Sequence, residues 1–260
     1  MACTACTTGI VHAGTPLGKE VTIGPLQSYV TGNENSKRII VFGTDVFGWR
    51  LTNARLLADE FAKRDFWVVV PDLFGGRDLP LWTLAATEHR DKTTWRQWLL
   101  LPPLLIFHWI PFLLRNTRAS QVDKISSLVS HLRATHPDAK IGLAGFCWGG
   151  RYALALNHLF DATFAAHPSR VRFPEELEGI TKPISFAVAE TDKQYNAKRA
   201  EETEALLRSK GFNDFEVVVF KGVHHGWTVR TDLTNPDKKA KRDQARDQAI
   251  NWFEKHLTIY

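Results

Sequence analysis

One cysteine-centred turn constrains the fold of this chain more than any other feature. Residues 145–150 read GFCWGG, in which Gly145 ends the apolar run KIGLAG and a helix-forming run follows Cys147. Glycines two positions before and after Cys147 are typical of the strand-turn-helix known as a nucleophile elbow. Glycine suits these positions because the turn is sharp and side chains there would collide with the neighbouring strand and helix. Cys147 is therefore our candidate nucleophile, and the alternative is a buried cysteine that only packs in a tight turn.

Apolar, β-branched runs alternate with helical patterns along the whole chain. The expected strands are EVTIGPLQSYV (split at Gly24-Pro25), RIIVFG, FWVVVP, KIGLAG, ATFAAH, ISFAVA and FEVVVF, and the expected helices are TNARLLADEFAKR, QVDKISSLVSHLRATH, WGGRYALALNHLF, NAKRAEETEALLRSKG and 236–256. This alternation predicts an α/β fold, with a mostly parallel central sheet and helices on both faces, in one domain over residues 1–260. Functional residues are expected at the carboxyl ends of the strands.

Two later strands end in residues that a thiol nucleophile needs. Asp192 follows ISFAVA and His225 follows FEVVVF. This is the order nucleophile, acid, histidine that the α/β-hydrolase fold uses for a catalytic triad. Glu190 is a competing acid that still belongs to the strand end, and His224 competes with His225. The interpretation that we favour is a triad of Cys147, Asp192 and His225.

Acyl transfer also needs donors for a developing oxyanion. The backbone N–H of Trp148, just after the nucleophile, is one candidate, and the N–H of Val46, in the loop after RIIVFG, is the other. These residues predict a covalent acyl-cysteine mechanism that needs no metal and no cofactor.

The segment 74–118 interrupts the alternation. It is rich in proline and holds the apolar run LLLPPLLIFHWIPFLL at 99–114, which is too short and too broken by proline for a bilayer span. We expect no stable membrane insertion, and we interpret 74–118 as a lid or cap inserted over the site. An interfacial anchor or an interaction surface is the alternative, so a homodimer stays open.

Composition limits the partners and the compartment. The formal net charge is +5, but basic residues are spread along the chain, which does not favour nucleic-acid binding. A mildly positive field is compatible with an anionic small substrate. The first residues show no basic segment followed by an apolar one, and Cys3 and Cys6 in the terminus are a poor basis for a disulfide framework. The expected location is cytoplasmic.

Five motifs in the same order, GTDVFGW, VVVPDLF, GFCWGGRYA, AETD and HHGWTVR, resemble the dienelactone hydrolase family. The fungal branch is the most similar, since its members begin much like TTGIVHAGTPLGKEVTIGPLQSYV. The resemblance implies an α/β-hydrolase fold, ester or lactone hydrolysis, the triad Cys147, Asp192 and His225, and an oxyanion hole from the amides of Val46 and Trp148.

The resemblance also bears on substrate binding. In the family a carboxylate in the first loop contacts the resting thiol, and Asp45 holds that position where bacterial members have glutamate. Arg230 matches a family arginine that binds the substrate carboxylate. A second such arginine has no assigned counterpart, although Arg77 is near its place in the chain.

Three functions remain distinguishable. The first is hydrolysis of a small ester or lactone, as in the dienelactone hydrolases. The second is a pathway-specific hydrolase or thioesterase acting on a bulkier, for example polyketide-derived, ester, lactone or thioester beneath the lid. The third is a non-catalytic small-molecule-binding homologue, which an unreactive Cys147 would support.

Overall fold

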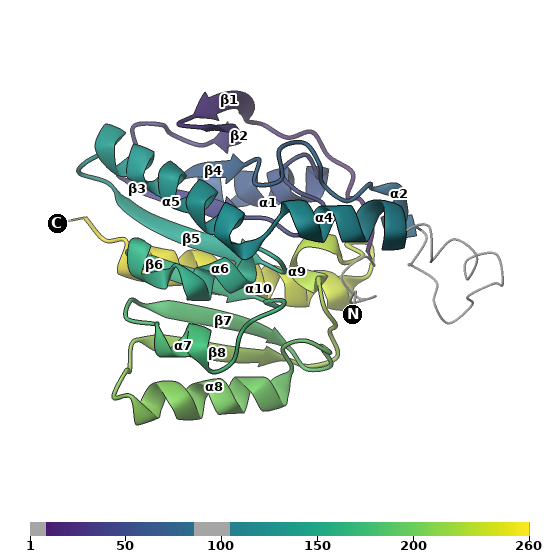
Figure 1. Ribbon diagram of the computed structural model, residues 1–260, viewed down its shortest axis with the longest axis vertical. Helices are drawn as coiled ribbons and strands as arrows, with labels where there is room; N and C mark the ends of the chain where they lie inside the picture. The colour runs from purple at the N-terminus through teal and green to yellow at the C-terminus, as the bar shows by residue number, and fades with distance from the viewer. Residues whose placement is uncertain (1–8, 86–104, 260) are drawn as a thin grey trace.

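The computed structural model describes residues 9–85 and 105–259, so Cys3, Cys6 and the middle of the expected lid lie outside the described residues. An eight-stranded sheet forms the centre, in the order β1-β2-β4-β3-β5-β6-β7-β8 (Figure 1). The strands are β1 (Lys19–Ile23), β2 (Leu26–Thr31), β3 (Arg38–Gly43), β4 (Trp67–Pro71), β5 (Lys140–Phe146), β6 (Ala162–Ala166), β7 (Ile184–Ala189) and β8 (Phe215–Phe220). The β1–β2 and β2–β4 pairs are antiparallel and the remaining pairs are parallel, which confirms a mostly parallel sheet.

Helices cover both faces of this sheet, as expected. The helices α5, α6 and α8 lie on one face and α1 and α10 on the other (Figure 1). The helical elements are α1 (Thr52–Ala62), α2 (Trp82–Ala85), η3 (Leu105–Trp109, a π-helical turn), α4 (Ile110–Arg115), α5 (Arg118–Thr135), α6 (Gly150–Ala155), η4 (Asn157–Leu159, a 3-10 turn), α7 (Glu175–Glu178), α8 (Ala197–Ser209), α9 (Trp227–Arg230) and α10 (Pro236–His256). Alternation of strand and helix thus gives the predicted layers.

The central strands are buried on both faces, as their continuous apolar runs predict. Every residue of β4, β6 and β7 is buried, and so is β5 after its first residue. The parallel register of β3 and β5 sets Gly43 opposite Gly145. The loop after β3 and the cysteine turn after β5 therefore leave the sheet side by side.

Local capping fixes where the long helices begin. The side chains of Thr117, Asn196 and Asn235 accept hydrogen bonds from backbone N–H groups in the first turns of α5, α8 and α10. Such side chains satisfy donors that the first turn of a helix leaves free. Pro236 then opens α10, which runs to His256 as predicted.

The helix after the cysteine turn is shorter than its sequence predicts. The run WGGRYALALNHLF indicates one helix over residues 148–160, but α6 ends at Ala155 and η4 follows. Asn157 explains the break, because its buried side chain accepts the N–H groups of Thr181 and Lys182 and donates to Thr163. An asparagine engaged in this way competes with continuation of the helix.

The described part of the segment 74–118 consists of α2, η3, α4 and the loops beside them. Phe112 on α4 is buried, whereas Phe107 and Leu114 are largely exposed. The run from Leu99 lies partly outside the described residues, and the lid stays a prediction. Among the residues that are described, no helix is long and apolar enough to cross a membrane.

Candidate active site

Cys147 sits in a strained turn between β5 and α6. Its φ is 52°, a left-handed conformation that non-glycine residues rarely adopt, and its side chain is fully buried. The turn is held in place because the Cys147 N–H donates to the Ala166 carbonyl at 3.1 Å. A Cβ on Gly149 would lie 2.0 Å from the carbonyl oxygen of Gly43, so no side chain fits there. These features are the ones that a nucleophile elbow requires.

His225 and Asp192 meet Cys147 at the carboxyl edge of the sheet. The Nε2 atom of His225 lies 3.0 Å from the Cys147 sulfur, and its Nδ1 atom lies 2.6 Å from Oδ2 of Asp192. All three side chains are buried, with at most 1% exposed. The order sulfur, imidazole, carboxylate is the geometry in which a base activates a nucleophile and an acid orients the base.

The two competing residues lie elsewhere. The carboxylate of Glu190 accepts the Gly222 N–H at 2.9 Å, and the ring of His224 bonds to the backbone carbonyl of His225 at 3.0 Å. The structure thus brings Asp192 and His225 to the cysteine and leaves both competitors in loop contacts.

The electrostatics of Cys147 and His225 favour a thiolate–imidazolium ion pair. Burial lowers the pKa of His225, but the Cys147 thiolate and the bonded Asp192 more than compensate and raise that pKa to about 10. An imidazolium that keeps its proton to this pH stabilises a thiolate next to it. Cys147 can therefore act as a nucleophile without a further base.

The predicted oxyanion residues lie in the two loops that the sheet register brings together. The Gly149 N–H donates to the Thr44 carbonyl at 3.0 Å, which joins the loop after β3 to the cysteine turn. Val46 and Trp148 are both buried in these loops. In the part of the chain that is described, the backbone N–H groups of Val46 and Trp148 have no acceptor, so both can serve a ligand oxygen.

Asp45 and Arg230 form a buried ion pair. Nη1 of Arg230 donates to Oδ2 of Asp45, with each side chain 1% exposed. The other carboxylate oxygen of Asp45 accepts the Phe47 N–H at 3.0 Å. Burial raises the pKa of Asp45, against the lowering effect of Arg230, and the charge of Cys147 adds to the increase. Both residues therefore belong to the surroundings of the thiol, and their roles in substrate binding stay predictions.

One buried residue next to the triad was absent from our sequence prediction. His167 follows β6, and its ring centroid lies 5.0 Å from that of His225. The signal was available, because His167 ends the run ATFAAH at the same sheet edge as Asp192 and His225. Our sequence prediction assigns His167 to the strand and gives it no role in the site.

Aromatic side chains from the described part of segment 74–118 pack beside the cysteine turn. The Phe112 ring lies 5.2 Å from that of Trp148 and 5.0 Å from that of Phe74. Trp148 and Phe74 are 6.4 Å apart in an edge-to-face contact. Helix α4 therefore contacts the residue that follows Cys147.

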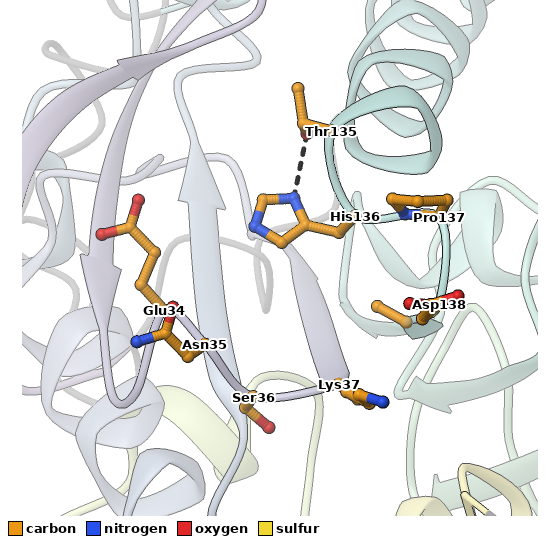
Figure 2. Close-up of a pocket in the computed structure, with 9 residues that line it drawn as sticks. Glu34, Asn35, Ser36, Lys37, Thr135, His136, Pro137 and Asp138 are labelled. Carbon is orange, nitrogen blue, oxygen red and sulfur yellow. Dashed lines mark hydrogen bonds between the residues drawn. The ribbon is translucent and has the colours of Figure 1, made fainter.

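A cavity of about 440 Å³ lies at the opposite end of the strands. Figure 2 shows His136, after α5, facing the loop that leads into β3. The lining residues are Glu34, Asn35, Ser36, Lys37, Thr135, His136, Pro137, Asp138 and Ala139. These residues precede β3 and β5, so this cavity lies at the amino ends of the parallel strands, away from Cys147.

Comparison by sequence gives one family and several relatives. The model of the dienelactone hydrolase family matches residues 26–257. The hydrolase tropI of Talaromyces stipitatus is 29% identical over 259 residues, covering 97% of this chain and 95% of that protein. A carboxymethylenebutenolidase homolog of Homo sapiens is 29% identical over 250 residues, covering 93% and 92%.

Comparison by structure supports the same fold. The dienelactone hydrolase of Anabaena variabilis superposes with a TM-score of 0.59 at 14% identity, over 95% of this chain and all of that one. An α/β serine hydrolase without lid from Xanthomonas campestris gives a TM-score of 0.59 at 12% identity, over 96% and 100%. The predicted α/β-hydrolase fold is confirmed.

Proposed function

Because the chain belongs to the dienelactone hydrolase family and is an ester or lactone hydrolase, we propose that it cleaves its substrate through an acyl intermediate on Cys147. The observation that carries this proposal is the buried line of contacts from Cys147 to His225 at 3.0 Å and from His225 to Asp192 at 2.6 Å. A thiol, an imidazole and a carboxylate in this order form a complete acyl-transfer unit.

Acylation begins with the thiolate of Cys147. Its sulfur attacks the substrate carbonyl carbon, and the electron pair of the carbonyl moves to oxygen, where the amides of Val46 and Trp148 donate to it. The intermediate collapses as the carbon–oxygen bond to the leaving group breaks, and His225 gives its proton to the departing oxygen. An acyl-thioester on Cys147 and a neutral His225 remain.

Deacylation reverses these roles. His225, now neutral and held by Asp192, takes a proton from water, and the resulting hydroxide attacks the thioester carbonyl. The second tetrahedral intermediate expels the Cys147 thiolate and frees the carboxylic acid. The starting pair of thiolate and imidazolium is restored, so no cofactor or metal enters the cycle.

We further propose that Asp45 and Arg230 sense an anionic substrate. In the resting protein Asp45 occupies the guanidinium of Arg230. A substrate carboxylate that reached Arg230 would compete with Asp45 for it, and Asp45 lies close enough to Cys147 for their charges to interact. Substrate charge and thiol activation would then be linked through one buried carboxylate.

A second candidate is a hydrolase or thioesterase for bulkier substrates. The aromatic contact of Phe112, Phe74 and Trp148 supports it, because this cluster offers an apolar wall beside the nucleophile. A panel of esters, lactones and acyl-thioesters of increasing size separates the candidates. If Phe112→Ala shifts the preference toward larger acyl groups, the aromatic cluster selects the substrate. An unchanged preference would favour hydrolysis of a small ester or lactone.

The acyl-cysteine mechanism has a direct test. The protein is mixed with an activated ester, quenched in acid, and the modified peptide is identified by mass spectrometry. We expect the acyl mass on the Cys147 peptide, and no adduct and loss of turnover in Cys147→Ala. A Cys3→Ala/Cys6→Ala double variant, which leaves Cys147 as the remaining thiol of the chain, is the matched control and should react like the original protein. Full turnover by Cys147→Ala would exclude the proposal.

A further inference from the structure

His167 is a buried histidine beside the triad that the mechanism above does not use. It is fully buried at the carboxyl end of β6. Its ring lies edge-to-face on that of His225, with 5.0 Å between the centroids. The Cys147 side chain is also near enough to His167 to raise the pKa of its ring. Among the described residues, His225 is bonded to the carboxylate of Asp192 and His167 is bonded to the hydroxyl of Thr228.

The backbone around His167 is tied to the nucleophile on both sides. The Cys147 N–H donates to the carbonyl of Ala166 at 3.1 Å, and the Ser169 N–H donates to the carbonyl of Cys147 at 3.0 Å. Between these two bonds His167 has a φ of 36°, in the left-handed region that non-glycine residues rarely occupy. Such a conformation persists where the surrounding structure imposes it, and here the two backbone bonds hold the chain on each side of His167 close to Cys147.

Thr228 fixes the other side of the ring. Its hydroxyl lies 2.7 Å from Nε2 of His167, and both side chains are buried. The opposite nitrogen, Nδ1, is buried and makes no aligned hydrogen bond among the described residues. The Cys147 side chain is nevertheless close enough to this ring to raise the pKa of His167.

The ring is neutral, so it carries a single N–H. Burial lowers the pKa of His167 to about 4, although the neighbouring Cys147 acts in the opposite direction. If Nε2 carried the proton, the lone pair of Nδ1 would face the thiolate. If Thr228 donates its hydroxyl proton to Nε2, the ring proton is on Nδ1 and can meet the anionic sulfur. A thiolate therefore selects the second arrangement.

We propose that His167, oriented by Thr228, donates its Nδ1–H to the thiolate of Cys147, in addition to His225 and to the Ser169 hydroxyl, which lies 3.9 Å from the sulfur. This inference rests on the proposed function, because it assigns a role in the thiolate cycle. The donor stabilises the sulfur anion at the start of the reaction. It acts again in deacylation, when the thiolate is the leaving group and the carbon–sulfur bond breaks.

Other charged groups around the sulfur must be kept constant in any test. His225 faces it from the loop after β8 with Asp192 behind, and Asp45 and Arg230 lie close enough for their charges to interact with the site. Substitutions at His167 and Thr228 leave these four residues in place, so a change in the thiol titration reports on the donor.

The test is a titration of the thiolate in the Cys3→Ala/Cys6→Ala background, by its ultraviolet absorbance and by the rate of iodoacetamide alkylation against pH. His167→Phe keeps an aromatic ring but removes the N–H donor. Thr228→Val keeps His167 but removes the hydroxyl that holds the ring proton on Nδ1. We expect His167→Phe to raise the thiol pKa and to slow alkylation on the acidic side about tenfold, as loss of one hydrogen bond to a charged group predicts. Thr228→Val should raise the thiol pKa by a smaller amount, and Thr228→Ser should restore the original titration.

Deacylation supplies a second readout that a purely structural role would not move. With an activated ester, loss of the donor should slow product release after the first turnover, so that His167→Phe shows a larger burst and accumulates acyl-enzyme. An unchanged thiol titration in folded His167→Phe and Thr228→Val would overturn the inference. If His167→Phe does not fold, the Thr228→Val and Thr228→Ser pair decides. Failure of the proposed function is a separate result, because it appears in the unsubstituted protein as the absence of any acyl adduct.

Discussion

The backbone N–H of Gly149 donates a 3.0 Å hydrogen bond to the carbonyl of Thr44, which joins the turn that carries Cys147 to the loop that carries Val46. The two proposed oxyanion donors thus belong to one hydrogen-bonded unit. Their spacing depends on a close approach of backbone to backbone at Gly43 and Gly149.

That close approach predicts a large cost for a single methyl group. In Gly149→Ala the new Cβ would lie 2.0 Å from the carbonyl oxygen of Gly43, so the turn must move. We expect a loss of about 1–3 kcal/mol in the free energy of unfolding, as overpacking typically gives. Gly179→Ala is the control, because a Cβ there meets nothing within 4 Å, and it should change stability by less than about 0.5 kcal/mol. Urea unfolding of both variants measures this, and equal stability would contradict the argument.

The acid of the triad can be told from its competitor by substitution. Asp192→Asn keeps the shape of the side chain but removes the charge that orients His225, and we expect kcat to fall on the order of 10³-fold. Glu190→Gln alters a carboxylate that bonds the Gly222 N–H, and its kcat should stay within about threefold. Steady-state kinetics on one activated ester compare the two, and the reverse ranking would assign the acid to Glu190.

The raised pKa of His225 predicts that hydrolysis and alkylation separate at high pH. A thiolate is present while His225 is protonated, so iodoacetamide should react well below pH 8.5, the ordinary pKa of a cysteine. Hydrolysis needs the imidazolium as a proton donor, so its rate should fall as the pH rises through about 10 while alkylation continues. Rates measured from pH 5 to 10.5 test this, and an alkylation rate that rises with an ordinary thiol pKa would refute it.

Removing only one partner of the buried ion pair of Asp45 and Arg230 should lower the free energy of unfolding strongly. Arg230→Met leaves the Asp45 carboxyl buried without its partner, for which about 3–5 kcal/mol is typical. The double variant Asp45→Asn/Arg230→Met should recover much of this loss, because no buried charge remains at either position. Thermal unfolding with calorimetry gives the comparison. A double variant as unstable as Arg230→Met alone would show that the pairing is not the cause.

The order of strands explains why the proximity of Cys147, Asp192 and His225 could be predicted from the sequence. Cys147, Asp192 and His225 follow three different strands, and parallel strands end at one edge of the sheet, so the chain order already brings them together. The bounds of α10 were also predictable, because Asn235 and Pro236 mark a helix start with local chemistry alone.

The rest depended on contacts between distant residues. The ion pair of Asp45 with Arg230 joins positions 185 apart in the chain, and no local pattern indicates it. Asn157 ends α6 through bonds to a loop more than 20 residues later. His167 looked like the end of a strand, and its place beside His225 became visible only in the folded chain.

The proposed nucleophile follows β5 in the middle of the sheet, whereas His225 follows β8, one of the two edge strands, which is partly exposed along most of its length. An edge strand is held by a single neighbour and opens at a lower free energy than the centre. Detachment of β8 would carry His225 away and leave Cys147 an ordinary buried thiol inside an intact core. Local opening of β8 would therefore abolish hydrolysis before the protein unfolds, while the Cys147 thiol stays buried and unreactive.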